Sequence, residues 1–393
     1  MPHFRPRSTY LLFLAGLHQA LIALSYTLKH TQHRSWAFSL IAFVTYRILF
    51  RSRFASLTGI TIIDNTIGSC ILFQTASAFH RLVVIDAHTS LYRIREKPGY
   101  IASASFKERL FWGIDLLFNP RGVGWAHKIS RLPRATDKTT DSRIKFILSR
   151  SRKLCLDATI FLFLLVFWAI DPTITYGLAQ DFSQSLFRRS YISLLGLLGV
   201  FMVLDAIHCI VSMTAVGLGF SSPFDWPPFF GSPTNAYNLR NLWGEVWHQS
   251  LRKSLGALSD SVIQSSLPQS WRPDRSTIVY RLLRLHVVFF LSGLIHMGAD
   301  FVTMGRWSSS FLIFFLLQPL GITLEIVAQH IFMGSLGRVK EPSMMWRLVG
   351  YIWVICWLSA VMPFAQGFIS ETGAHHGIPG LDIDGEQPPF FRL

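Results

Sequence analysis

Long apolar stretches dominate the chain and alternate with segments that are polar and mostly basic. Most of these stretches run for about 20 residues, the length that a helix rising about 1.5 Å per residue needs to cross a hydrocarbon core of about 30 Å. We predict transmembrane helices at residues 9–28, 36–50, 57–85, 154–170, 191–219, 282–304, 310–332 and 346–368. The pattern therefore predicts an all-α integral membrane protein with about eight transmembrane helices.

The composition favours a membrane protein over a soluble one. Half of the 393 residues are apolar and only 15% are charged, whereas soluble domains carry roughly a quarter charged residues. Much of the net charge of +15 lies between the apolar stretches, since residues 93–153 hold fifteen Lys and Arg against five acids. Basic loops of this kind usually face the cytosol beside an anionic leaflet. Membrane orientation explains the charge better than binding to nucleic acid, which we do not expect.

The spacing of the apolar stretches divides the chain into four regions. We predict N-terminal transmembrane helices over 1–92, a basic cytosolic loop over 93–153, a membrane core over 154–370 that includes a cytosolic motif loop at 220–280, and a flexible tail over 371–393. The first apolar stretch is long for a signal peptide and lacks a clean small-residue cleavage site, so we interpret it as a retained helix. The four cysteines have no metal-like spacing.

The segment from Asn238 to Arg252 is rich in polar and aromatic side chains. In a helix, residues that recur every four positions share a face, and the members of this face are Arg240, Gly244, His248 and Arg252, with Trp243 and Trp247 beside them. This pattern predicts an amphipathic helix at the membrane surface. The basic residues Arg240, Arg252 and Lys253 suit the phosphates of a nucleotide-type carrier such as coenzyme A, and lipid headgroups are the alternative.

A second candidate is His296, which lies inside the apolar stretch 282–304. An ionisable side chain about 16 Å into such a stretch is costly and is a functional hypothesis by default. Ser292 and Asp300 lie four residues away on either side, so Asp300 could accept a proton from His296 and fix its tautomer. The alternative is a histidine that only packs between helices. The same alternative applies to Asp157, Asp205, His208, His286 and Glu325.

Several other chemistries are excluded by spacing. A di-iron desaturase needs histidines at short helical intervals, and the adjacent pair His375 and His376 lies in the tail. No paired Asp-rich motif for a magnesium diphosphate is present, which weighs against a membrane prenyltransferase. No strained turn carries a serine for a hydrolase triad. The sequence therefore predicts no metal site.

Four motifs together resemble the wax synthase-like branch of the membrane-bound O-acyltransferase (MBOAT) superfamily. They are Asn238 to Arg252, the preceding Pro-Pro-Phe-Phe-Gly-Ser, the span that holds Ser-Gly-Leu-Ile-His296, and Arg121-Gly-Val-Gly-Trp125. The chain is particularly similar to fungal members that acylate terpenoid and polyketide-terpenoid hydroxyls. It departs from the branch at Leu242, where Phe is usual, and at Glu245 and Val246, where basic residues are usual.

The resemblance implies a helical fold with a tunnel through the membrane, His296 at its catalytic centre and His248 near the cytosolic donor entrance. A buried neutral imidazole at His296 would act as general base on the acceptor hydroxyl, which then attacks the thioester carbonyl. His248, Asn238 and Trp243 are candidates to stabilise the oxyanion. We expect Asp300 to orient His296, and Arg240, Arg252 and Lys253 to contact the donor.

The expected activity is transfer of an acetyl group from acetyl-CoA, as co-substrate, to a hydroxyl of a hydrophobic terpenoid-type acceptor. We expect no permanently bound cofactor and a multi-pass location in the endoplasmic reticulum membrane. The alternatives are a long-chain wax or sterol ester synthase, which would use the same residues, and a polytopic transporter. A transporter usually shows an internal repeat and paired broken helices, and neither is evident in the sequence.

Overall fold

The computed structural model describes residues 6–51, 61–129, 132, 142–170, 185–333 and 342–371. These residues form helices and no strand, apart from one isolated bridge between Arg93 and Trp125. The longer helices are α1 (Pro6–Ser25), α2 (Thr31–Arg51), α3 (Thr61–Phe79), α6 (Phe106–Phe118), α7 (Arg143–Ile170), α9 (Leu186–Gly217), α11 (Arg252–Ser266), α12 (Ile278–Met304), α13 (Ser310–Met333) and α14 (Met344–Glu371). The short elements are η1 (His80–Val84), α4 (Ala87–Ser90), α5 (Tyr100–Ser103), η3 (Pro223–Asp225), η4 (Pro233–Asn235), α10 (Leu239–Asn241), η5 (Leu242–Val246) and η6 (Gln269–Trp271).

The predicted apolar stretches fall on long helices. Among the described residues, five helical segments are long and apolar enough to cross a membrane: Ile63–Val84, Phe187–Gly217, Ile278–Thr303, Ser310–Ile331 and Met344–Ala365. The apolar part of α1, Thr9–Ser25, is shorter, while α2 and α7 carry several basic residues. The prediction of an all-α membrane protein is confirmed, whereas the count of about eight spans stays a prediction.

The N-terminal helices form one packing unit with the segment that follows them. Tyr26, which directly follows α1, Trp112 of α6 and Trp125 are almost completely buried in a common apolar cluster. The Arg109 side chain of α6 donates to the Thr27 carbonyl at 2.8 Å. The first part of the predicted basic loop is thus folded against α1, and the prediction that this loop is cytosolic stays untested. Residues 133–141 of that loop and the tail from 372 onward lie outside the described residues.

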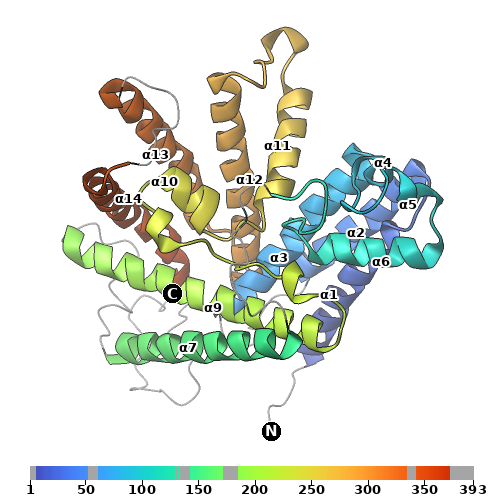
Figure 1. Ribbon diagram of the computed structural model, residues 1–393, viewed down its shortest axis with the longest axis horizontal. Coiled ribbons are helices and arrows are strands. Elements are labelled where there is room, and N and C mark those ends of the chain that lie inside the picture. The colour runs from blue at the N-terminus through green and yellow to red at the C-terminus, as the bar shows by residue number, and fades with distance from the viewer. Residues whose placement is uncertain are drawn as a thin grey trace, which may run out of the picture.

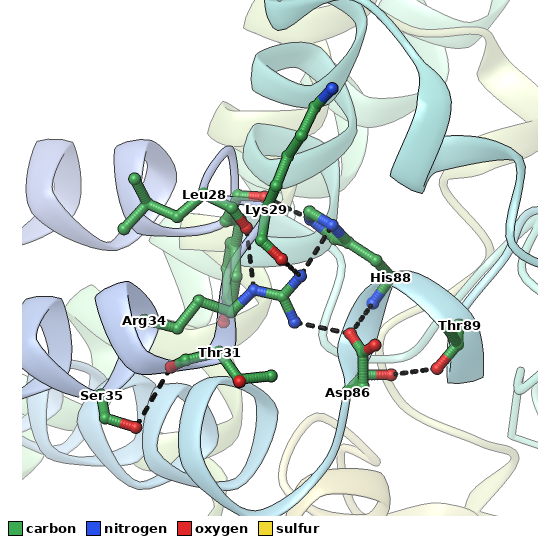
Figure 2. A network of polar contacts seen from close by, with 9 residues as sticks. Leu28, Lys29, Thr31, Arg34, Ser35, Asp86, His88 and Thr89 are labelled. Carbon is green, nitrogen blue, oxygen red and sulfur yellow. Dashed lines mark hydrogen bonds and ion pairs between the residues drawn. The ribbon is translucent and has the colours of Figure 1, made fainter.

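A buried arginine fastens the α1–α2 turn to the chain after η1 (Figure 2). Arg34 donates to the carbonyls of Leu28 and Lys29, to Asp86 Oδ1 and to His88 Nδ1, the last at 2.8 Å. His88 then donates from Nε2 to the Tyr26 carbonyl at 2.7 Å, so its ring is held as a neutral imidazole. A buried guanidinium is tolerated here because acceptors surround it.

Helix α12 joins the two halves of the molecule. It packs on α3 from the N-terminal half, on α13 from the C-terminal half, and beside α11, with which it forms the hairpin coloured yellow to brown in Figure 1. Helices α7 and α9 pack together along their length, and α14 packs on α9 and α13. The core of the C-terminal half is aromatic, with Phe289, Phe314 and Phe315 packed around α10 and η5. Side chains from α3, α12 and α13 therefore meet near one point.

The prediction of one amphipathic helix from Asn238 to Arg252 is wrong. The chain makes the single turn α10 and the wide turn η5, becomes extended at Trp247, and starts α11 at Arg252. The reason lies in the backbone hydrogen bonds. The Val246 carbonyl accepts from the Gly231 N–H at 2.9 Å, and the Gln249 amide donates to the Trp243 and Trp247 carbonyls. These partners lie outside a helical ladder, so the four residues at i, i+4 spacing do not share a face.

Candidate active site

His296 lies on α12 between side chains of α13 and α3. Its ring stacks on Phe315 of α13, with centroids 4.8 Å apart and planes at 15°, and Phe311 lies at 5.4 Å. Its Nδ1 is 3.3 Å from Ser69 Oγ of α3. Because Nδ1 of His296 contacts this hydroxyl, the other ring nitrogen, Nε2, is the one that can contact a ligand. The histidine expected to be buried in a span is thus oriented by two neighbouring helices.

Asp300 lies one turn further along α12 and is fully buried. Its Oδ1 accepts a hydrogen bond from Asn65 Nδ2 of α3 at 2.9 Å. The described structure shows no hydrogen bond between Asp300 and His296, although their spacing predicts one. The polar partner of His296 is instead Ser69, one turn along α3 from Asn65. Helix α3 therefore supplies a seam of polar groups to the face of α12 that carries His296.

His248 lies in the turn between η5 and α11, packed among aromatic rings. It stacks on Phe229, with centroids 5.5 Å apart and planes at 15°, and contacts Phe230 and Trp247. Its Nδ1 is buried and has no hydrogen-bond partner among the described residues. Burial, and then the neighbouring His296 and Arg121, lower the pKa of His248 to about 3. The ring is therefore neutral at physiological pH and has an unused polar atom.

A chain of ring contacts links the two histidines. Phe315 stacks on His296 and meets Trp243 at 6.3 Å, Trp243 meets Trp247 at 5.8 Å, and Trp247 meets His248 at 5.4 Å. The structure thus links, through three intervening rings, the two residues that were selected from the sequence as catalytic candidates.

The motif Arg121 to Trp125 supports the turn that holds His248. Arg121 donates from Nη2 to the Pro227 carbonyl at 3.0 Å and from Nη1 to the Pro228 carbonyl at 2.8 Å. Its Cζ lies 5.5 Å from the centre of the Phe229 ring, on which His248 stacks. Two glycines of the motif adopt positive φ angles, which let the chain reverse tightly after α6. Two motifs far apart in sequence therefore form one support.

Asn238 and Trp243 are already engaged in local structure. Asn238 Oδ1 accepts from the Asn241 N–H at 2.7 Å and caps α10. Trp243 Nε1 donates to Gln318 Oε1 of α13 at 3.1 Å. Glu325 anchors the same region, because its Oε1 accepts from the Leu239 N–H at 2.6 Å and from Trp353 Nε1 at 2.8 Å. Of the three oxyanion candidates, His248 is the one whose buried ring nitrogen has no partner among the described residues.

The three basic residues predicted to contact the donor differ in burial and in their partners. Arg240 and Arg252 are exposed, and Arg252 Nη1 donates to the Gly244 carbonyl at 2.5 Å and to Gln249 Oε1 at 3.1 Å. Lys253 is half-buried, and burial, Arg284 and Arg81 lower its pKa. Arg81 and Arg284 could not be recognised from the sequence as neighbours of Lys253, because they lie on η1 and α12.

A separate polar cluster lies between α7 and α9. Ligand atoms of Asp157, Asp205 and Cys209 lie within 4.8 Å of one another, a spacing suited to a metal ion. Lys153 Nζ already lies 3.6 Å from Asp157 Oδ1 and contacts Asp205 Oδ2. The ammonium group supplies the positive charge that the carboxylates need inside the protein. We therefore interpret the cluster as an ion-paired connection between two helices.

The sequence is similar to known acyltransferases. The model of the membrane bound O-acyl transferase family matches residues 226–317, a segment that includes His248 and His296. The acetyltransferase ataH of Aspergillus terreus is 30% identical over 304 residues, which cover 70% of this chain and 94% of that protein. The acetyltransferase sirH of Emericella nidulans is 27% identical over 68% of this chain and 61% of its own. The acetyltransferase ple2 of Rhodocybe pseudopiperita is 28% identical over 76% of each chain.

These matches agree with the helical membrane fold. They confirm the predicted acyltransferase activity and the predicted multi-pass membrane protein. An acyl donor and an acceptor are its substrates, and its surroundings are lipid. The chain belongs to the membrane bound O-acyl transferase family.

Proposed function

We propose that this protein transfers an acetyl group from acetyl-CoA to a hydroxyl of a hydrophobic, terpenoid-type metabolite in the endoplasmic reticulum membrane. The acetyl group is supported by the names of the similar proteins, which are acetyltransferases. The observation that carries the mechanism is the chain of aromatic contacts that links His296 to His248. Such surroundings exclude water, which would otherwise compete with the acceptor hydroxyl.

In the proposed mechanism His296 is the general base. Its Nε2 takes the proton of the acceptor hydroxyl while the hydroxyl oxygen attacks the thioester carbonyl carbon. The tetrahedral intermediate then collapses, the carbon–sulfur bond breaks, and the imidazolium returns the proton to the leaving coenzyme A sulfur. Ser69 holds the ring through Nδ1, and the proposed role of Asp300 is to position α12 against α3 through Asn65.

His248 is the proposed oxyanion donor. A neutral imidazole donates a hydrogen bond from one nitrogen. Nδ1 of His248 is buried and has no hydrogen-bond partner among the described residues, so it is the nitrogen proposed to donate to the oxyanion. A donor preorganised in a water-poor site stabilises the developing negative charge more than it stabilises the substrate carbonyl. Asn238 and Trp243 would contribute by fixing α10 and η5. Lys253, with Arg240 and Arg252 at the surface, is the proposed contact for the donor.

Parallel donor assays test the proposed function. Microsomes containing the protein would be incubated with a panel of hydroxylated terpenoids and either acetyl-CoA or palmitoyl-CoA, with microsomes containing His296→Gln as the matched control. We expect mass spectrometry to detect an acetyl ester that the control lacks. Ester formation from palmitoyl-CoA alone would favour a long-chain ester synthase. No ester from either donor would refute the proposal for this acceptor class.

A further inference from the structure

Cationic side chains from three elements meet at the start of α11. Arg81, on η1, donates from Nη2 to Ser254 Oγ at 3.4 Å, so it reaches the residue next to Lys253. Arg284, on α12, lies against the same turn, because a Cβ added to Gly256 would be only 2.4 Å from its Nη2. Burial, and then the charges of Lys253 and Arg81, lower the pKa of His127 to about 4. The first turn of α11 is therefore surrounded by positive charge.

Part of this charge has no counter-ion in the described structure. Asp260 pairs with Arg284, with Nε to Oδ1 at 2.6 Å. Arg81 donates only to neutral acceptors, the Leu116 carbonyl at 2.9 Å and Ser254. Lys253 has neither a hydrogen bond nor an ion pair among the described residues. About two positive charges thus remain uncompensated in a partly buried place, where their mutual repulsion is costly.

The helix adds to this positive field. The free N–H groups and the dipole of a helix N-terminus favour negative charge, yet the first turn of α11 carries Arg252 and Lys253. Its N-cap residue, Leu251, provides no side-chain hydrogen bond. Nδ1 of His127 is buried and also has no partner among the described residues. An anion with several oxygen acceptors would satisfy the N–H groups, the ammonium and the imidazole together.

We propose that Lys253, Arg81, His127 and the first turn of α11 form a binding site for a phosphate ester. The identity of the ligand rests on the proposed function: if coenzyme A is the donor, the ligand is one of its phosphates. The same chemistry would fit the headgroup of an anionic lipid. The site adds Arg81 and His127 to the predicted donor contacts.

Lys253 is the residue to change first, because it has no hydrogen bonds whose loss would unfold the protein. The full chain would be placed in phosphatidylcholine nanodiscs, and the affinity for coenzyme A would be measured for wild type, Lys253→Gln and Lys253→Arg. The matched control is Lys107→Gln, an exposed lysine on α6. Hydrogen bonds to charged groups contribute enough for a loss of about tenfold or more with Gln. We expect Arg to restore most of the affinity and the control to match wild type.

Further arms identify the phosphate. Dephospho-coenzyme A, which lacks the 3′-phosphate, distinguishes that group from the diphosphate, and nanodiscs containing phosphatidic acid report a lipid headgroup. A lower affinity of Lys253→Gln for coenzyme A or for phosphatidic acid supports the site. The ligand whose affinity falls more is the source of the phosphate. The proposal is overturned if Lys253→Gln binds both ligands as the control does. The two proposals stay distinguishable, because coenzyme A binding without any acetyl transfer by the wild type would refute the function and leave the anion site standing.

Discussion

Ser69 offers a quantitative test of how His296, the proposed catalytic base, is held. In Ser69→Ala the hydroxyl 3.3 Å from His296 Nδ1 is removed, while α3 and the stacking on Phe315 remain. A neutral hydrogen bond is worth about 0.5–1.5 kcal/mol, and about 1.4 kcal/mol corresponds to a factor of ten in rate. We therefore expect kcat to fall by about twofold to tenfold. The KM for the acetyl donor should change little, because Ser69 orients the base and does not contact the donor in the proposed mechanism.

The assay is steady-state acetyl transfer in nanodiscs at saturating acceptor, with Ser69→Thr as the conservative control that keeps a hydroxyl. A double-mutant cycle with His296→Gln sharpens the measurement, because a residue that acts only through His296 has no further effect once the base is absent. The reasoning is refuted if Ser69→Ala lowers the rate equally in the wild-type and His296→Gln backgrounds. It is also refuted if Ser69→Ala is as active as wild type.

Three further predictions concern the histidines and the topology. His296→Gln should lower kcat by about 10² to 10⁴-fold while coenzyme A binding, measured by equilibrium dialysis, stays at the wild-type level; near wild-type kcat would show that His296 only packs. The pKa of His248, lowered to about 3, means that the unfolded chain binds more protons than the folded one from about pH 6.5 down to about pH 3. Acidification from pH 7 to pH 5 should therefore lower the thermal unfolding midpoint of wild type more than that of His248→Gln, and equal shifts would contradict the assigned burial. A cysteine at the exposed Arg272, in a cysteine-free background, should react with an impermeant thiol reagent in sealed microsomes whose cytosolic face is outside; protection until detergent is added would reverse the predicted orientation.

The helices could be predicted because their signal is local. A run such as 282–304 is apolar over the length that a membrane requires, and the helix that forms there, Ile278–Met304, differs by a few residues at its start. His296 could also be selected as a candidate from the sequence, since a lone histidine in such a run is costly. Local composition was sufficient for both conclusions.

The partners of the site residues could not be predicted, because they are distant in sequence. The i, i+4 spacing suggested Asp300 as the partner of His296, but the choice of Ser69 depends on how α3 packs on α12. The spacing around His248 suggested one helix, because the sequence does not reveal that the Val246 carbonyl bonds to Gly231. Arg81 and Lys253 are also far apart in the sequence, so their proximity could not be predicted and is seen only in the folded structure.

The buried Arg34 has a consequence for how the chain is assembled during synthesis. Its acceptors come from the α1–α2 turn and from residues 86 and 88, which leave the ribosome later (Figure 2). The first two helices are therefore synthesised while the guanidinium still lacks two of its acceptors. The α1–α2 turn becomes fixed when the chain beyond η1 arrives and supplies Asp86 and His88. The N-terminal helices thus depend on a part of the chain that is made after them. A ribosome-bound fragment ending before residue 86 would lack the hydrogen bonds from Arg34 to Asp86 and His88.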